Sequence, residues 1–327
     1  MTATEPAPDE VTGTVAPAPP REPRHHDPVA YGLLGIMAVC FAGTWVAAHW
    51  ATEEIPPLTT ACLRFLVATG LLWAWARLSR VPTRIRRDDL PLIAAMGVTG
   101  IVVYNLSFLN GVRLAPSSDG AVIVPGLSPV IVAVMLAVRY GVRPLRQALV
   151  GLGLALGGLI LVMGPAMTGS PARALGDVLF VAGAVGWAAY SVLSRDAVRR
   201  FHPVTATLAA AAFGVVAFAP LALFERGWEP ALAASPRALA SVLYLGALGT
   251  VVAFVAFSEG IRRIGAPRAS AFIVLVPLLG VALSAWLLGE PVTVSAIGGT
   301  ALVLGGLWLV QTARPRRASV PSSPSLS

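Results

Sequence analysis

Two charged side chains fall inside long apolar stretches of the sequence. Arg64 lies within 58–76, and Asp119 lies near the start of 117–138. A charge is costly to bury among apolar groups, so such positions commonly serve binding or ion pairing. The guanidinium of Arg64 could bind a carboxylate through two hydrogen bonds, with Asp119 holding Arg64 or carrying a proton. The alternative is a structural Arg64–Asp119 pair, or an arginine whose charged end reaches the interface.

Four more ionisable residues lie at the ends of apolar stretches. Glu259 and His49 can both change charge, so they are candidates for proton coupling, with an interfacial position as the alternative. Asp177 and Glu290 are expected at helix ends that water reaches, and neither is assigned chemistry.

Polar and aromatic side chains near the middle of the apolar stretches could line a binding cavity. Trp187 and Tyr190, three residues apart, share one helix face. Aromatic walls with few polar groups suit small molecules, whereas helix packing or lipid contact is the alternative for each residue. The remaining candidates are Thr44, Trp45, Tyr104, Asn105, Ser128 and Ser191.

Three prolines interrupt helix hydrogen bonding within these stretches. Pro125 and Pro129 lie in 117–138, and Pro277 lies at the matching place in 268–288. Each proline lacks the N–H that would bond to the carbonyl four residues back. The three positions are candidate hinges, and static kinks satisfied by neighbouring hydroxyls are the alternative.

The elements that must position these residues are membrane-spanning helices. Hydrophobic residues make up 56% of the chain and charged residues 12%, with a mean hydropathy of +0.76. Such a composition predicts an all-α integral membrane protein, because a helix of about 20 apolar residues crosses a bilayer. We expect ten spans: 30–50, 58–76, 91–112, 117–138, 145–164, 176–194, 204–224, 238–258, 268–288 and 293–312.

The net charge of +8 indicates membrane orientation, not nucleic-acid binding. The 24 basic residues are all Arg, and most lie in short loops. Assigning the loops to alternate sides places most arginines, together with both termini, on one side. Because positive residues stay in the cytoplasm, both termini are predicted cytoplasmic in an inner, or cell, membrane. Residues 1–29 and 313–327 are expected to be disordered tails.

The two halves of the chain repeat. An offset of 148 places Pro129 on Pro277 and Gly141 on Gly289, and similarly Gly151, Gly157 and Gly158 on Gly299, Gly305 and Gly306. An offset of 146 places Pro57 on Pro203 and the acidic pair at 53–54 on the basic pair at 199–200. Five helices per half reverse the second half in the membrane, so we expect two inverted repeats, 30–164 and 174–312.

Three segments resemble the EamA-like branch of the drug/metabolite transporter superfamily. They are EEIPPLTTACLRF at 53–65, GWAAYSVLSRDAVRRFHPVT at 186–205 and PLLGVALSAWLLGEPVTVSAIGGTALVLGGLWL at 277–309. The resemblance implies a ten-helix secondary transporter with a central cavity, often an exporter of amino acids or other small metabolites. One departure is Val142, which stands opposite Glu290 where the first half lacks the acidic residue.

Other functions are less well supported by the motifs. No GxxxxGK[ST] loop implies ATP, and neither HExxH nor GxSxG is present for a membrane-embedded enzyme. A multidrug or lipophilic-cation exporter is the other transport class considered, although 30–50 has no carboxylate. No cofactor or metal site is expected, and Cys40 and Cys62 are interpreted as packing residues.

Small residues recur at intervals of four in the last span of each half. Gly153 with Gly157, and Ala301 with Gly305, allow close helix packing, either within the chain or in a homodimer.

Overall fold

The structure is a computed structural model that describes residues 27–141, 145–167, 170–264, 269 and 272–313. Its elements are all helical: α1 (Pro28–Glu54), α2 (Pro57–Leu78), η1 (Arg87–Asp89), α3 (Leu90–Met96), η2 (Gly97–Val103), α4 (Tyr104–Leu114), α5 (Ser117–Tyr140), α6 (Arg146–Met167), α7 (Pro171–Arg200), α8 (Pro203–Glu225), α9 (Trp228–Ala233), α10 (Pro236–Leu243), η3 (Tyr244–Val252), α11 (Ala253–Ile264), η4 (Phe272–Val274), α13 (Leu275–Leu288) and α14 (Val294–Thr312). Most of both predicted tails, and Val142, lie outside the described residues.

Eight helical segments of the described chain are long and apolar enough to cross a membrane. They correspond to the first eight predicted spans, with α3, η2 and α4 forming one continuous segment and α10, η3 and α11 contributing another. The last two predicted spans correspond to shorter apolar helices, 272–288 and 294–310. The outer surface is apolar, since Phe224, Trp286 and Ile160 expose 85%, 79% and 68% of their area. The protein is therefore a multi-pass membrane protein.

Helix starts follow from proline and from capping side chains. Five helices begin with proline, which fits the first helical position because no hydrogen bond is lost there. The Asp27 carboxylate accepts a hydrogen bond from Ala30 N at 3.1 Å, and this bond is the main reason that the pKa of Asp27 is lowered. Pro57 and Pro203, which the 146-residue offset aligns, both begin helices.

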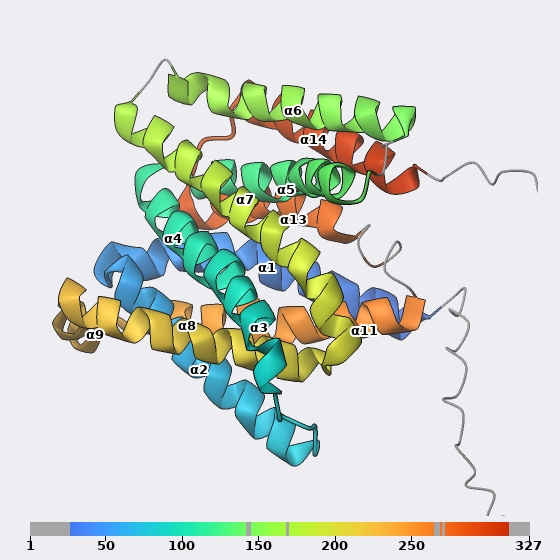
Figure 1. The fold of residues 1–327 in the computed structure, drawn as a ribbon. Helices are drawn as coiled ribbons and strands as arrows, with labels where there is room; N and C mark the ends of the chain where they lie inside the picture. Colours follow the sequence, from blue (N-terminus) through green and yellow to red (C-terminus); the bar gives the residue numbers. More distant parts are fainter. Residues whose placement is uncertain (1–26, 142–144, 168–169, 265–268, 270–271, 314–327) are drawn as a thin grey trace, which may run out of the picture.

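The internal repeat is visible in the backbone. Gly141 and Gly289, aligned by the 148-residue offset, both end a helix in the left-handed conformation, with φ of 65° and 68°. Segments η2 and η3 are wider π-helical turns at matching places in the two halves. In Figure 1, α1 and α7, the first helices of the halves, run in opposite directions across the bundle.

The contact between α6 and α14 has the same internal symmetry. A Cβ atom on Gly151 would lie 2.6 Å from the Gly306 carbonyl oxygen, and one on Gly158 would lie 2.5 Å from that of Gly299. The offset exchanges these two pairs, so each half contributes the same surface. Gly153, in contrast, has no neighbour in this contact and is exposed. The predicted Gly153–Gly157 pair is therefore not the pair that joins the two helices.

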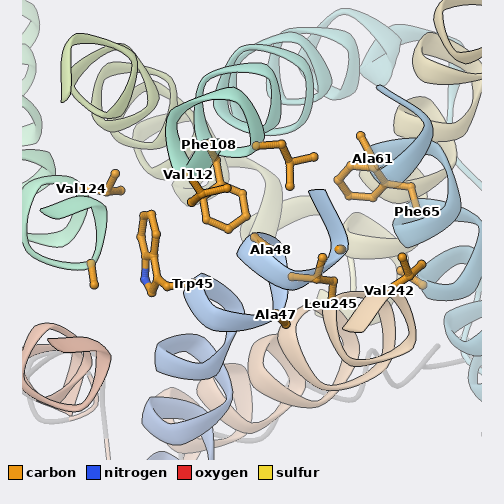
Figure 2. Close-up of a cluster of buried hydrophobic side chains, with 14 of the residues drawn as sticks. Trp45, Ala47, Ala48, Ala61, Phe65, Phe108, Val112, Val124, Val242 and Leu245 are labelled. Atoms are coloured by element: carbon orange, nitrogen blue, oxygen red, sulfur yellow. The ribbon is translucent and has the colours of Figure 1, made fainter. Parts of the chain in front are cut away.

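A buried aromatic cluster fills the centre of the bundle, where helices of both halves meet. The Trp45 ring lies edge-on to Phe108 at 4.8 Å and to Phe180 at 5.7 Å between ring centres. Figure 2 shows Trp45 and Phe108 side by side within this cluster. Close packing there gives the neighbouring cavity rigid walls.

Candidate functional site

A cavity of about 430 Å³ lies between the two halves. Elements α1, α2, η2, α4 and α5 line it from the first half, and α7, α8, η3, α11, η4, α13 and α14 from the second. All nine predicted substrate-binding residues border it: Thr44, Trp45, Arg64, Tyr104, Asn105, Ser128, Trp187, Tyr190 and Ser191. The candidate hinges Pro125 and Pro129 also line it, whereas Pro277 is buried in α13 outside the lining.

Arg64 is the charged residue of the described cavity lining. Only 6% of it is exposed, and its Nε and Nη1 donate hydrogen bonds to Thr250 Oγ1 and Asn105 Oδ1, both at 3.1 Å. Both partners are neutral, and no acidic residue stands among the described residues that line the cavity. The positive charge of Arg64 is thus hydrogen-bonded without being neutralised in the described part of the chain.

The two π-helical segments orient the partners of Arg64. Asn105 Nδ2 donates to the Ile101 carbonyl of η2 at 2.8 Å, which turns Oδ1 toward the guanidinium. Thr250 Oγ1 donates to the Leu245 carbonyl within η3 at 2.8 Å, so a lone pair of Oγ1 is left for Arg64 Nε. Equivalent irregular turns of the two halves therefore hold one arginine.

Aromatic rings also line the cavity. Trp187 lies 5.3 Å from Tyr104, 5.5 Å from Tyr190 and 5.8 Å from Phe254 between ring centres. The Trp187–Tyr190 contact confirms that these two residues share a face. The Tyr190 ring packs on the backbone of Gly100, where any side chain would collide with it.

Several cavity residues were missed by the sequence reasoning. Phe41, Phe65 and Phe254 are ordinary apolar residues of long helices, so nothing in their type distinguishes them from lipid-facing phenylalanines. Thr207 and Thr250 also line the cavity, and each could have been found as Thr44 was, as a polar side chain within an apolar stretch.

The predicted pair of Arg64 with Asp119 is wrong. Asp119 Oδ2 instead accepts from Arg173 Nη2 at 2.7 Å and Nε at 3.1 Å, and Asp119 is not part of the cavity lining. The reason is that α7 begins at Pro171, earlier than predicted, which places Arg173 in its first turn beside the first turn of α5.

The other candidate coupling residues also lie away from the cavity. His49 is within 3.3 Å of the Val112 carbonyl through Nδ1 and within 3.4 Å of Glu53 through Nε2. Glu259 accepts from Arg263 Nε at 2.6 Å, and Arg263 also pairs with Asp27 at 3.1 Å, joining the start of α1 to α11. Each residue is partly exposed and pairs with a side chain one turn away on its own helix.

At one end of the bundle, carboxylates cap helix N-termini and tie neighbouring helices together. This capped end comprises the ends of α1, α8 and α13 and the starts of α2, α5 and α10. Glu225 accepts from the backbone N of Leu58 and Thr59 at 3.2 and 2.9 Å, and Glu54 accepts from Ser235 N at 2.6 Å. Charge-assisted bonds of this kind are stronger than bonds between neutral groups.

Glu290 forms the third cap. Its carboxylate accepts from the backbone N of Ser117 and Ser118 at 2.7 and 2.9 Å, and so ties the end of α13 to the start of α5. The cavity extends away from this end, to Thr207 near the start of α8 and Val310 near the end of α14. The start of α1 and the end of α14 are both at that opposite end (Figure 1).

Two stretches of the chain, 29–164 and 174–312, match the model of the EamA-like transporter family. The chain belongs to the EamA-like transporter family. Its members are transporters, and an uncharacterized transporter of Archaeoglobus fulgidus is 28% identical over 84% of this chain and 96% of its own.

A probable terminal-alkyne amino-acid exporter of Streptantibioticus cattleyicolor is also 28% identical to this EamA-like chain, over 81% of it and 86% of the relative. A solved crystal structure shares the fold, with a TM-score of 0.63 at 22% identity, over 88% of this chain and 99% of the other.

Proposed function

We propose that this EamA-like protein is a secondary active transporter that exports small metabolites carrying a carboxylate, such as amino acids. The observation that carries the proposal is Arg64, a buried cation in the cavity whose described partners are both neutral. A carboxylate that enters the cavity supplies the missing negative charge and two further acceptors. The aromatic wall around Trp187 accommodates the apolar part of the same molecule.

Alternating access between two inverted halves of five helices each is the proposed mechanism. The arginine-rich loops support cytoplasmic termini, which makes the capped end external. The conformation then has its cavity toward the cytoplasm and its outer side closed by Glu54, Glu225 and Glu290. Release outside requires these caps to open, with Pro125, Pro129 and Pro277 as the proposed hinges.

A transport assay tests the proposal. Purified protein in liposomes is offered a panel of radiolabelled amino acids and other small metabolites, with and without a pH gradient, beside protein-free liposomes. We expect saturable flux of carboxylate-bearing solutes. Flux that is absent for every small metabolite would overturn the proposal.

The aromatic rings of the cavity also favour a second candidate, export of lipophilic cations, since flat cations stack on such rings. The buried charge of Arg64 opposes it. Flux of tetraphenylphosphonium in the same assay distinguishes the two candidate functions. A carboxylate transporter should give no more of this flux than protein-free liposomes do.

A further inference from the structure

Asp177 is a buried carboxyl that the cavity does not use. It lies on α7 six residues after Pro171, its exposed fraction is 0%, and neither oxygen meets a hydrogen-bond donor of the described chain. The expectation that water reaches it is therefore wrong. Gly176, its neighbour, is pressed against Ala115, so α4 and α5 cover this part of α7.

The charged groups around Asp177 are few. Asp119 on α5 and Arg173 on α7 are close enough to act on it electrostatically, and Glu290 of the α13 end acts on Asp119. Arg173 directs Nε and Nη2 to Asp119, and Glu290 caps the start of α5. Of the charged residues on other elements against α7, Arg113 of α4 is exposed, Arg146 begins α6 at the opposite end, and Glu225 of α8 binds α2.

One arginine therefore faces two carboxyl groups. Its hydrogen bonds and charge are taken by Asp119, which leaves Asp177 next to a like charge and without donors. An ionised carboxylate in such a place is strongly disfavoured, whereas a neutral carboxylic acid is tolerated.

We propose that Asp177 is a proton-binding site that is filled when the capped end is closed. This inference rests on the proposed function, because it assumes that the capped end opens during transport. Arg173 and Asp177 are four residues apart on α7, the spacing at which helix side chains form ion pairs. When the start of α5 moves away from α7, Arg173 loses Asp119 and pairs with Asp177, whose carboxyl gives its proton to water as hydronium.

The site thus links acidity at the capped end to closure. Closing takes up one proton, which returns the carboxylate of Asp177 to the neutral acid and Arg173 to Asp119. Acid therefore favours the closed form, and alkali favours the open form.

Infrared spectroscopy tests the bound proton in the full-length protein without any substrate. We expect a carboxylic-acid C=O band at neutral pH that Asp177→Asn removes and that Glu229→Gln, a change of an exposed acid, leaves in place. Asp119→Asn should also remove the band, because it frees Arg173 for Asp177. A band that survives Asp177→Asn would overturn the assignment.

Thiol labelling tests the link to closure. Ser118→Cys, at the start of α5, reports opening of the capped end through its reaction rate with a maleimide. The ratio of rates between the wild-type and Asp177→Asn backgrounds cancels ionisation of the thiol itself. We expect this ratio to rise with pH, by at most about tenfold per unit for one proton. A ratio independent of pH would overturn the proposal.

Two further arms complete the test. Asp177→Glu keeps a carboxylic acid at this position, so it should retain the acid band at a shifted frequency. If Asp177→Asn fails to fold, this shift identifies the residue that gives the band. Spectra recorded in sodium chloride and in choline chloride at the same pH test whether Asp177 binds a sodium ion instead of a proton. Loss of the acid band on adding sodium would contradict the assignment of a bound proton. Neither measurement involves transport, so failure of the transport assay and failure of this proposal are separate results.

Discussion

At the scale of single residues, the site depends on how a buried arginine is held without being neutralised. Asn105 and Thr250 each use their own donor on a backbone carbonyl, and so offer only an acceptor to Arg64. This arrangement fixes the guanidinium while preserving its charge for an incoming anion. A carboxylate in place of either residue would satisfy Arg64 internally and abolish that preference.

Asn105→Ala should therefore destabilise the protein more than its neighbour Asn110→Ala. Both amides donate to the backbone carbonyl four residues back, Asn105 to Ile101 and Asn110 to Leu106, but only Asn105 also accepts from Arg64. Losing a partner of a buried charged donor costs about 1–3 kcal/mol. The midpoints of thermal unfolding in detergent measure the difference, and equal midpoints would show that the Arg64–Asn105 bond contributes nothing.

At the scale of elements, the two halves are joined where glycines allow α6 and α14 to touch along their backbones. Gly151 and Gly158 face Gly306 and Gly299 across this contact, whereas Gly153 faces outward. The repeat offset identified the four facing glycines and the four-residue spacing identified Gly153, but neither pattern could say which of them face the partner helix. That distinction depends on the rotation of each helix, which the three-dimensional contact decides.

Gly158→Ala tests this contact, with Gly153→Ala as the matched control on the same helix. The new methyl group at 158 would lie 2.5 Å from the Gly299 oxygen, while the one at 153 meets nothing within 4 Å. Forcing the helices apart should cost about 1–3 kcal/mol. Unfolding by a denaturing detergent is the measurement, and the idea fails if the 153 variant is equally destabilised.

At the scale of the whole molecule, the apolar stretches predicted the helical membrane architecture, and the candidate residues that line the cavity were identified by polarity and depth. A position near the middle of an apolar stretch was enough to identify these residues, because the two halves meet in the middle of the bundle. The partners of Arg64 and the burial of Asp177 were not predictable. The first needs the π-helical turns of η2 and η3, and the second needs the lateral packing of α4 and α5 on α7.

The most direct test of the central claim, that Arg64 binds the carboxylate of the cargo, compares each transported amino acid with its amide. In liposomes with wild-type protein, the unlabelled amino acid should inhibit the flux of the labelled one far more strongly than its amide does, because the amide lacks the negative charge. Arg64→Gln should lose this preference, while Arg113→Gln, at an exposed arginine outside the cavity lining, should keep it. An unchanged preference in Arg64→Gln would contradict the account.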